Sequence, residues 1–174
     1  MRGGRLWLWV GGVAAVAACA AALAVWAIGS GPAGSTSAPS RARAYGSFQS
    51  CLLTGARGVA DPTAGQVWAG MEDASLKTGS KVAYLAVPGP ATAANAVSFV
   101  GSLVVRKCGV IVATGAAEQA AALADAPRFP AVRFVMAGGG TSGPAGGANV
   151  ALVSSAQPGL RNAVATMLVA DVEH

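Results

Sequence analysis

The sequence predicts an α/β fold: a single Rossmann-like lobe with an open, parallel five-stranded sheet and flanking helices, after an N-terminal apolar helix. From residue 47 onward, short apolar runs alternate with amphipathic stretches, the pattern of a parallel sheet covered by helices. Before residue 29, one uncharged apolar run is long enough to cross a membrane. A length of 174 residues allows one compact domain with appendages.

The expected strands are short apolar runs rich in β-branched residues, at 50–54, 82–87, 110–114, 132–136 and 150–153. The intervening segments carry apolar residues at helical spacing and predict helices at 63–77, 91–107, 116–126 and 158–172. Gly79 and Pro127 supply stop signals for the first and third helices, and Pro158 lies in the first turn of the last. Right-handed crossovers between parallel strands then give the strand order 2-1-3-4-5.

Residues 1–28 are predicted to be a membrane anchor or signal segment. The run at 6–28 carries no charge and would span about 35 Å as a helix, enough to cross the hydrocarbon core of a bilayer. Tryptophans lie near both ends, as in the aromatic belts of membrane helices. Because Arg2 and Arg5 precede the run, we expect the amino terminus to stay inside and the rest of the chain to lie on the extracytoplasmic side of the cell membrane.

Three fates of this segment stay open: an uncleaved anchor, a lipoprotein signal and a cleaved signal peptide. The stretch Val16-Ala17-Ala18-Cys19 resembles a lipobox, in which the cysteine is lipidated and becomes the new amino terminus. Against lipidation, the apolar run continues beyond Cys19, where a lipoprotein usually has a polar tether. Against cleavage, the run exceeds the apolar core of about 7 to 15 residues in a signal peptide. The uncleaved anchor is favoured, and all three fates place the domain outside the cytoplasmic membrane.

Residues 29–46 are small, polar and interrupted by two prolines, so they are predicted to form a flexible linker ahead of a domain at 47–174. Four of the five units of formal net charge arise before that domain, because from residue 47 onward there are eight Lys and Arg residues against seven Asp and Glu residues. A basic surface of the kind that binds nucleic acid is therefore not expected, and nucleic acid is excluded as a partner.

A family resemblance lies in five blocks: CLLT at 51–54, DPTAGQVWAG at 61–70, KCGVIVATG at 107–115, PAVRFV at 130–135 and NVALV at 149–153. In order and spacing they resemble the N-terminal lobe of the basic membrane protein (Bmp) family. Its members are ABC-transporter substrate-binding lipoproteins with the type 1 periplasmic-binding-protein fold, and several take purine nucleosides. The resemblance implies a ligand site between two lobes. We expect the second lobe to be missing here. The partner implied by the family resemblance is an ABC permease, and the partner implied by the missing lobe is a separate second-lobe protein.

The candidate ligand site consists of polar residues that follow the first and third strands: Asp61, Thr63, Gln66, Thr114 and Glu118. They would hydrogen-bond a small polar solute. A purely structural role competes with this hypothesis, since Asp61 or Thr63 can cap a helix, Glu118 can occupy a first helical turn and Gln66 can face solvent. The family carries an aromatic residue and an amide where this chain has Ala64 and Gly65, so the site is expected to be degenerate for nucleosides.

Enzymatic and metal-dependent functions are not expected. The only histidine is His174, and the three cysteines are far apart, so neither a nucleophile–histidine pair nor a zinc motif can be assembled. The glycine-rich run at 138–147 lacks the Gly-Lys-Ser/Thr ending of a phosphate loop, and no cofactor is predicted. Cys51 and Cys108 lie at the amino ends of strands expected to be neighbours, which predicts a disulfide in an exported domain. The alternative is two buried free thiols.

The function predicted from these observations is a membrane-attached, extracytoplasmic domain like a solute-binding protein, associated with an ABC importer of nucleoside-like solutes. The alternative is a membrane-tethered protein-interaction module with no small-molecule ligand.

Overall fold

The structure, a computed structural model, describes residues 44–139, 147–154 and 159–173. The predicted anchor at 1–28, with Cys19 and most of the 29–46 linker, lies outside these residues, as do His174 and most of the glycine-rich run. Among the helices in the described ranges, none has the length and apolar character needed to cross a membrane.

The described residues form an open sheet whose five strands are all parallel, as predicted. The strands are β1 (Gln49–Gly55), β2 (Lys81–Val87), β3 (Val110–Ala113), β4 (Arg133–Ala137) and β5 (Val150–Val153). Their order is β2-β1-β3-β4-β5, which confirms the predicted topology. Because β1 lies between β2 and β3, Leu52 is in register with Tyr84 on one side and with Val112 on the other.

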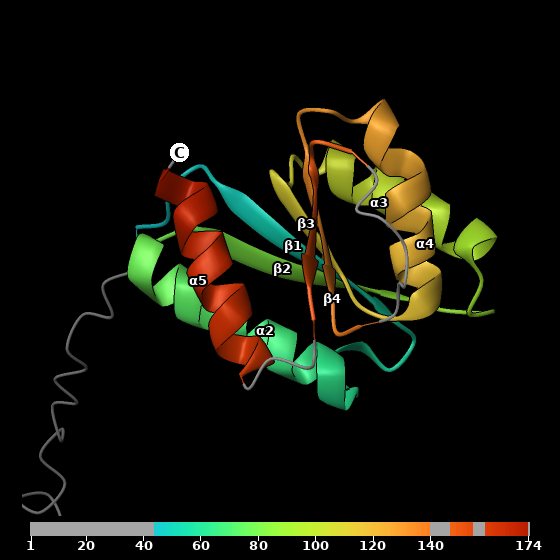
Figure 1. Cartoon of the computed structure of the whole chain (residues 1–174), viewed down its shortest axis with the longest axis horizontal. Helices are drawn as coiled ribbons and strands as arrows, with labels where there is room; N and C mark the ends of the chain where they lie inside the picture. Colours follow the sequence, from blue (N-terminus) through green and yellow to red (C-terminus); the bar gives the residue numbers. More distant parts are fainter. Residues whose placement is uncertain (1–43, 140–146, 155–158, 174) are drawn as a thin grey trace, which may run out of the picture. The chain divides into compact units, whose positions relative to one another are not determined.

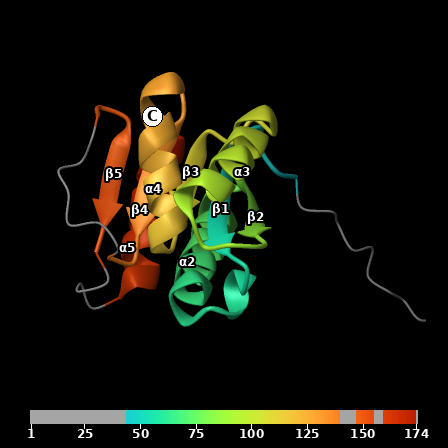
Figure 2. The same ribbon diagram turned by 90° about the vertical axis from the view of Figure 1, so that its right-hand side faces the viewer.

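Helices cover both faces of the sheet (Figures 1 and 2). One face carries α2 (Pro62–Thr78) and α5 (Leu160–Glu173), and the other carries α3 (Ala93–Val105) and α4 (Ala116–Asp125). Side chains alternate along β1, so Cys51 and Leu53 enter the core beneath α3 and α4, whereas Leu52 enters the core beneath α2. The described residues also contain two short 3₁₀ helices, η1 (Gly58–Ala60) and η2 (Ala126–Arg128).

Local signals move several helix ends from their predicted positions. Helix α3 is shorter than the predicted 91–107, because Thr92 caps its start by accepting a hydrogen bond from Asn95 N and Lys107, with φ 62°, ends the helical path. Helix α4 ends at Asp125, and the chain continues as the 3₁₀ turn η2, which contains Pro127.

Helices α2 and α5 approach closely at Gly70, where an added Cβ would overlap the carbonyl oxygen of Arg161. One turn further along α2, Asp73 forms a bidentate ion pair with the side chain of Arg161, with N–O distances of 2.5 and 2.7 Å. The hydrogen bonds from Arg161 lower the pKa of Asp73 below its ordinary value. The two helices are therefore joined by close backbone packing and by one ion pair.

The predicted disulfide between Cys51 and Cys108 is present, with a Cα–Cα distance of 5.8 Å. Both residues are buried in the core beneath α3 and α4. A second tether lies at the start of β5, where the Asn149 amide points to the carbonyl oxygens of Ala126, Phe129 and Val132 at 2.9 to 3.1 Å. Together these contacts fix segments that lie far apart in the sequence.

Candidate functional site

A crevice opens at the carboxyl ends of β1 and β3. The helices that follow these adjacent strands lie on opposite faces of the sheet, α2 on one and α4 on the other, so the chain diverges here (Figure 2). In open α/β sheets such a switch point is where ligands bind. The lining residues come from the ends of three strands and the starts of two helices: Thr54, Gly55, Ala56, Arg57, Asp61, Thr63, Thr114, Gly115, Glu118, Gln119 and Gly138.

Four of the five predicted site residues meet in this crevice: Asp61, Thr63, Thr114 and Glu118. The fifth, Gln66, is exposed on α2 and is not among the lining residues. The crevice has a volume of about 290 Å³, close to the lower end of the range of about 300 to 1,000 Å³ for small-molecule sites. It therefore has room for a small solute.

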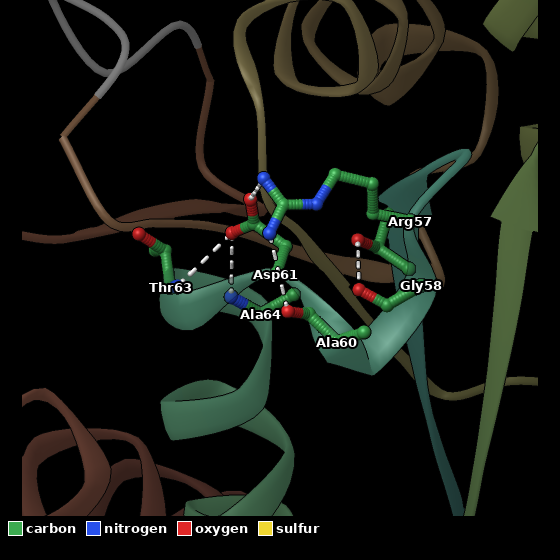
Figure 3. Close-up of polar contacts among 7 residues, drawn as sticks. Arg57, Gly58, Ala60, Asp61, Thr63 and Ala64 are labelled. Atoms are coloured by element: carbon green, nitrogen blue, oxygen red, sulfur yellow. Dashed lines mark hydrogen bonds and ion pairs between the residues drawn. The ribbon is translucent and has the colours of Figure 1, made fainter.

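Asp61 is held by the start of α2, as the structural interpretation of the sequence expected. Its Oδ1 accepts hydrogen bonds from the backbone N–H groups of Thr63 and Ala64, at 3.0 and 3.3 Å (Figure 3). Its Oδ2 lies 3.8 Å from the guanidinium of Arg57, which also donates to the carbonyl oxygen of Ala60. Because both side chains are substantially exposed, this ion pair contributes at most about 1 kcal/mol. It does, however, engage the one cationic side chain of the lining.

Glu118 lies in the first turn of α4 and is only 4 % exposed. Its carboxylate lies beside Gly115 and Gly55, where side chains at those positions would meet it, so the two glycines make room for it at the ends of β3 and β1. Gly115 has a φ of 93°, a conformation that glycine adopts without strain. Within the described residues, the Glu118 carboxylate has no hydrogen-bond or ion-pair partner.

Gln119 is a site residue that sequence reasoning missed. It is 1 % exposed, and its Nε2 donates to the carbonyl oxygens of Ala137, at 2.9 Å, and Ala113, at 3.4 Å. Its Oε1 is buried and has no partner among the residues described. The available signal was an amide in an otherwise alanine-rich helix directly after a strand end.

The hydroxyl groups of the two buried threonines of the lining are directed to backbone carbonyl oxygens. Thr54 Oγ1 donates to the carbonyl oxygen of Gly58 at 3.4 Å, and Thr114 Oγ1 lies 3.5 Å from the carbonyl oxygen of Leu53. Within the described residues, the crevice thus has unpartnered hydrogen-bond acceptors in the Glu118 carboxylate and Gln119 Oε1. Most of its side-chain donors already donate to backbone carbonyl oxygens. Over the described part of the chain, no cluster of three or more His, Cys, Asp or Glu side chains forms a metal-binding group.

Comparisons with known proteins support the fold alone. No family model matches the chain, and no curated protein matches its sequence. Among solved structures, the chain is similar to a "putative lipoprotein" fragment from Peptoclostridium difficile 630, with a TM-score of 0.58 and 12 % sequence identity. The similarity covers 73 % of this chain and 99 % of that one. The resemblance to the Bmp family stays a prediction.

Proposed function

We propose that this chain is a membrane-attached, extracytoplasmic domain built like one lobe of a solute-binding protein, and that it contacts a small polar solute in the crevice between β1 and β3. One observation carries the proposal: four of the five polar residues predicted as a site meet at the topological switch point, around a cavity of about 290 Å³. A crevice of this kind on a single lobe supplies half of a two-lobed site, so binding is expected to be weak.

Membrane attachment is supported by the apolar run at 6–28 and by the lipobox-like stretch that ends at Cys19. The "putative lipoprotein" with a similar fold is consistent with such attachment. Export follows from the basic residues ahead of the run. The Bmp resemblance adds an ABC permease, or a separate second-lobe protein, as the proposed partner.

Nucleosides are expected to bind poorly. None of the described residues that line the crevice is aromatic, so they offer a base no stacking platform. Trp68, the nearby aromatic residue of α2, packs edge-on against Tyr84 with ring centroids 5.4 Å apart, and neither lines the crevice. We propose that the site has lost the nucleoside preference implied by the family resemblance and accepts a smaller solute.

Calorimetry tests this proposal on the full-length chain in phosphatidylcholine nanodiscs, with guanosine, adenosine and a panel of small polar solutes. Nucleosides should bind no more tightly than about 1 mM, which corresponds to about 4 kcal/mol, whereas at least one small solute should give a saturable signal. A micromolar signal with guanosine would refute the loss of nucleoside binding. A parallel mass measurement shows whether a dimer supplies a second face to the site.

The second candidate function is a membrane-tethered interaction module. It is favoured by large apolar side chains exposed on both edge strands, Tyr84 on β2 at 47 % and Leu152 on β5 at 46 %. Replacement of both residues by threonine should abolish co-purification of a protein partner if this function holds. The same variant should leave the calorimetric signals of solute binding unchanged if the crevice is the functional site.

A further inference from the structure

We infer that the crevice selects solutes that carry a positively charged nitrogen, such as a protonated amine, and that Glu118 is the residue that sets this preference. The inference rests on the proposed function and names the class of solute for the same site.

The charges of the lining leave one carboxylate unneutralised. Among the described residues, the charged side chains that line the crevice are Arg57, Asp61 and Glu118. Arg57 and Asp61 form a pair at the exposed rim, whereas Glu118 is 4 % exposed and has no ion-pair partner within the described residues. A buried carboxylate without a cation is costly, and a cationic solute in the adjoining cavity would reduce that cost.

The hydrogen-bonding groups favour a ligand rich in donors. The Gln119 Nε2 group and the Thr54 hydroxyl are engaged with backbone carbonyls, while Gln119 Oε1 is a buried acceptor without a partner in the described ranges. The Glu118 carboxylate accepts only hydrogen bonds when ionised. A protonated primary amine has three N–H donors and no acceptor, so its chemistry matches that of both acceptors.

The position of Glu118 also disfavours an anionic solute. The amino terminus of α4 would otherwise be a positive end that attracts anions. Glu118 occupies that first turn, and its carboxylate lies beside Gly115, the residue directly before α4. An anion in the crevice would therefore meet the Glu118 carboxylate at the place where the helix would otherwise have offered its positive end.

Methyl NMR tests the inference on the full-length chain in phosphatidylcholine nanodiscs, with labelled threonine. The methyl groups of Thr54, Thr63 and Thr114 report on the crevice, and that of Thr78, near the C-terminal end of α2, reports on a remote surface. The probes are 2-aminoethanol, protonated at pH 7, and ethylene glycol, a neutral molecule of similar size. We expect saturable shifts of the crevice methyl groups with 2-aminoethanol, at least tenfold weaker binding of ethylene glycol and no shift at Thr78.

Variants separate charge recognition from a capping role of Glu118. Glu118→Gln keeps the size of the side chain but removes its charge, so the preference for 2-aminoethanol over ethylene glycol should fall at least tenfold. Glu72→Gln removes the same charge from an exposed position on α2 and should leave the preference unchanged. If Glu118→Gln does not fold, Glu118→Asp is tested in its place. This variant retains the carboxylate, so it must still bind 2-aminoethanol more tightly than ethylene glycol.

Two results would overturn the inference: equal binding of the two probes by the wild-type chain, or an unchanged preference in Glu118→Gln. If ethylene glycol or another neutral solute shifts the crevice methyl groups as strongly as 2-aminoethanol, the proposed solute site stands and only the charge selectivity fails. If no small solute shifts them, both proposals fail.

Discussion

The side-chain amide of Gln119 donates a hydrogen bond to the carbonyl oxygen of Ala137, with an N–O distance of 2.9 Å. Gln119 belongs to α4, and Ala137 is the last residue of β4. The same amide also points to the carbonyl oxygen of Ala113, at the end of β3, at 3.4 Å. One buried side chain therefore links the carboxyl ends of two neighbouring strands where they border the crevice.

Replacement of this amide should destabilise the domain. Gln119→Leu keeps a similar volume but leaves buried carbonyl oxygens without their side-chain donor, which should lower the free energy of unfolding by about 1 to 3 kcal/mol. Urea denaturation measures the change. The matched control is Gln66→Leu at an exposed position of α2, expected to change the free energy by less than about 0.5 kcal/mol. Equal effects at the two positions would contradict the bridging role of Gln119.

Close packing between α2 and α5 makes Gly70 intolerant of a side chain. In Gly70→Ala the new Cβ would overlap the carbonyl oxygen of Arg161, so overpacking should cost about 1 to 3 kcal/mol. Gly101 of α3 is the control, because an added Cβ there meets no atom within 4 Å. Gly101→Ala should stabilise the protein by up to about 1 kcal/mol through higher helix propensity. Thermal unfolding compares the two variants, and a stabilised Gly70→Ala would refute the close approach.

The pair between Asp73 and Arg161 predicts a defined pH response. Hydrogen bonding to Arg161 lowers the pKa of the Asp73 carboxyl in the folded state. The stabilisation from this pair is therefore present above the ordinary pKa of an aspartate, near 3.9, and is lost as the pH falls through the lower, folded-state pKa. An NMR titration of the Asp73 carboxyl should show its pKa rising in Arg161→Gln. An unchanged pKa in that variant would show that the pair does not form in solution.

Loss of the disulfide should destabilise the domain more than any of these single changes. The cysteines are 57 residues apart in sequence, for which the chain-entropy model gives about 4 kcal/mol. The double variant Cys51→Ala with Cys108→Ala should unfold at correspondingly lower urea concentration. Mass spectrometry of non-reduced, alkylated protein checks the pairing directly, and modification of both cysteines would disprove it.

Cys19→Ser distinguishes the two attached states of the amino-terminal segment. If residues 6–28 form an uncleaved anchor, the variant should stay in the membrane fraction with only the mass change of the substitution. Loss of a lipid-sized mass relative to the wild type would instead identify a lipoprotein. Recovery of the wild-type domain mainly in the culture supernatant would contradict both states.

The sheet could be predicted from the sequence because each strand is a short apolar run, and the helical segments between the strands favour parallel pairing with right-handed crossovers. The bounds of all five strands agree with the predicted bounds within one residue. Helix ends were harder to predict, since they depend on single residues such as Thr92, which caps α3, and Lys107, which adopts a left-handed conformation. The apolar pattern of a whole helix or strand therefore predicted that the element exists better than it predicted the residues at which the element begins and ends.

The candidate site was predictable where topology alone places a residue. Asp61 caps the helix that follows β1, and Glu118 lies in the first turn of the helix that follows β3, so the pairing of these two strands brings the residues together. Gln119 was missed because its role depends on the reach of a side chain to the end of β4, which spacing along one helix does not reveal. Gln66 was included from its proximity in sequence, but its direction on α2 exposes it to solvent.

The most direct test of the crevice as the solute site is a fragment screen by threonine-methyl NMR on the full-length chain. Thr54 and Thr114 report on the crevice, whereas Thr166 of α5 lines two other hollows, one toward α2 and one beside β5. If the crevice is the solute site, small polar fragments should cause saturable shifts of the methyl signals of Thr54 and Thr114 and leave that of Thr166 unchanged. Fragments that shift the methyl signal of Thr166 and leave the signals of Thr54 and Thr114 unchanged would contradict the assignment of the crevice as the solute site.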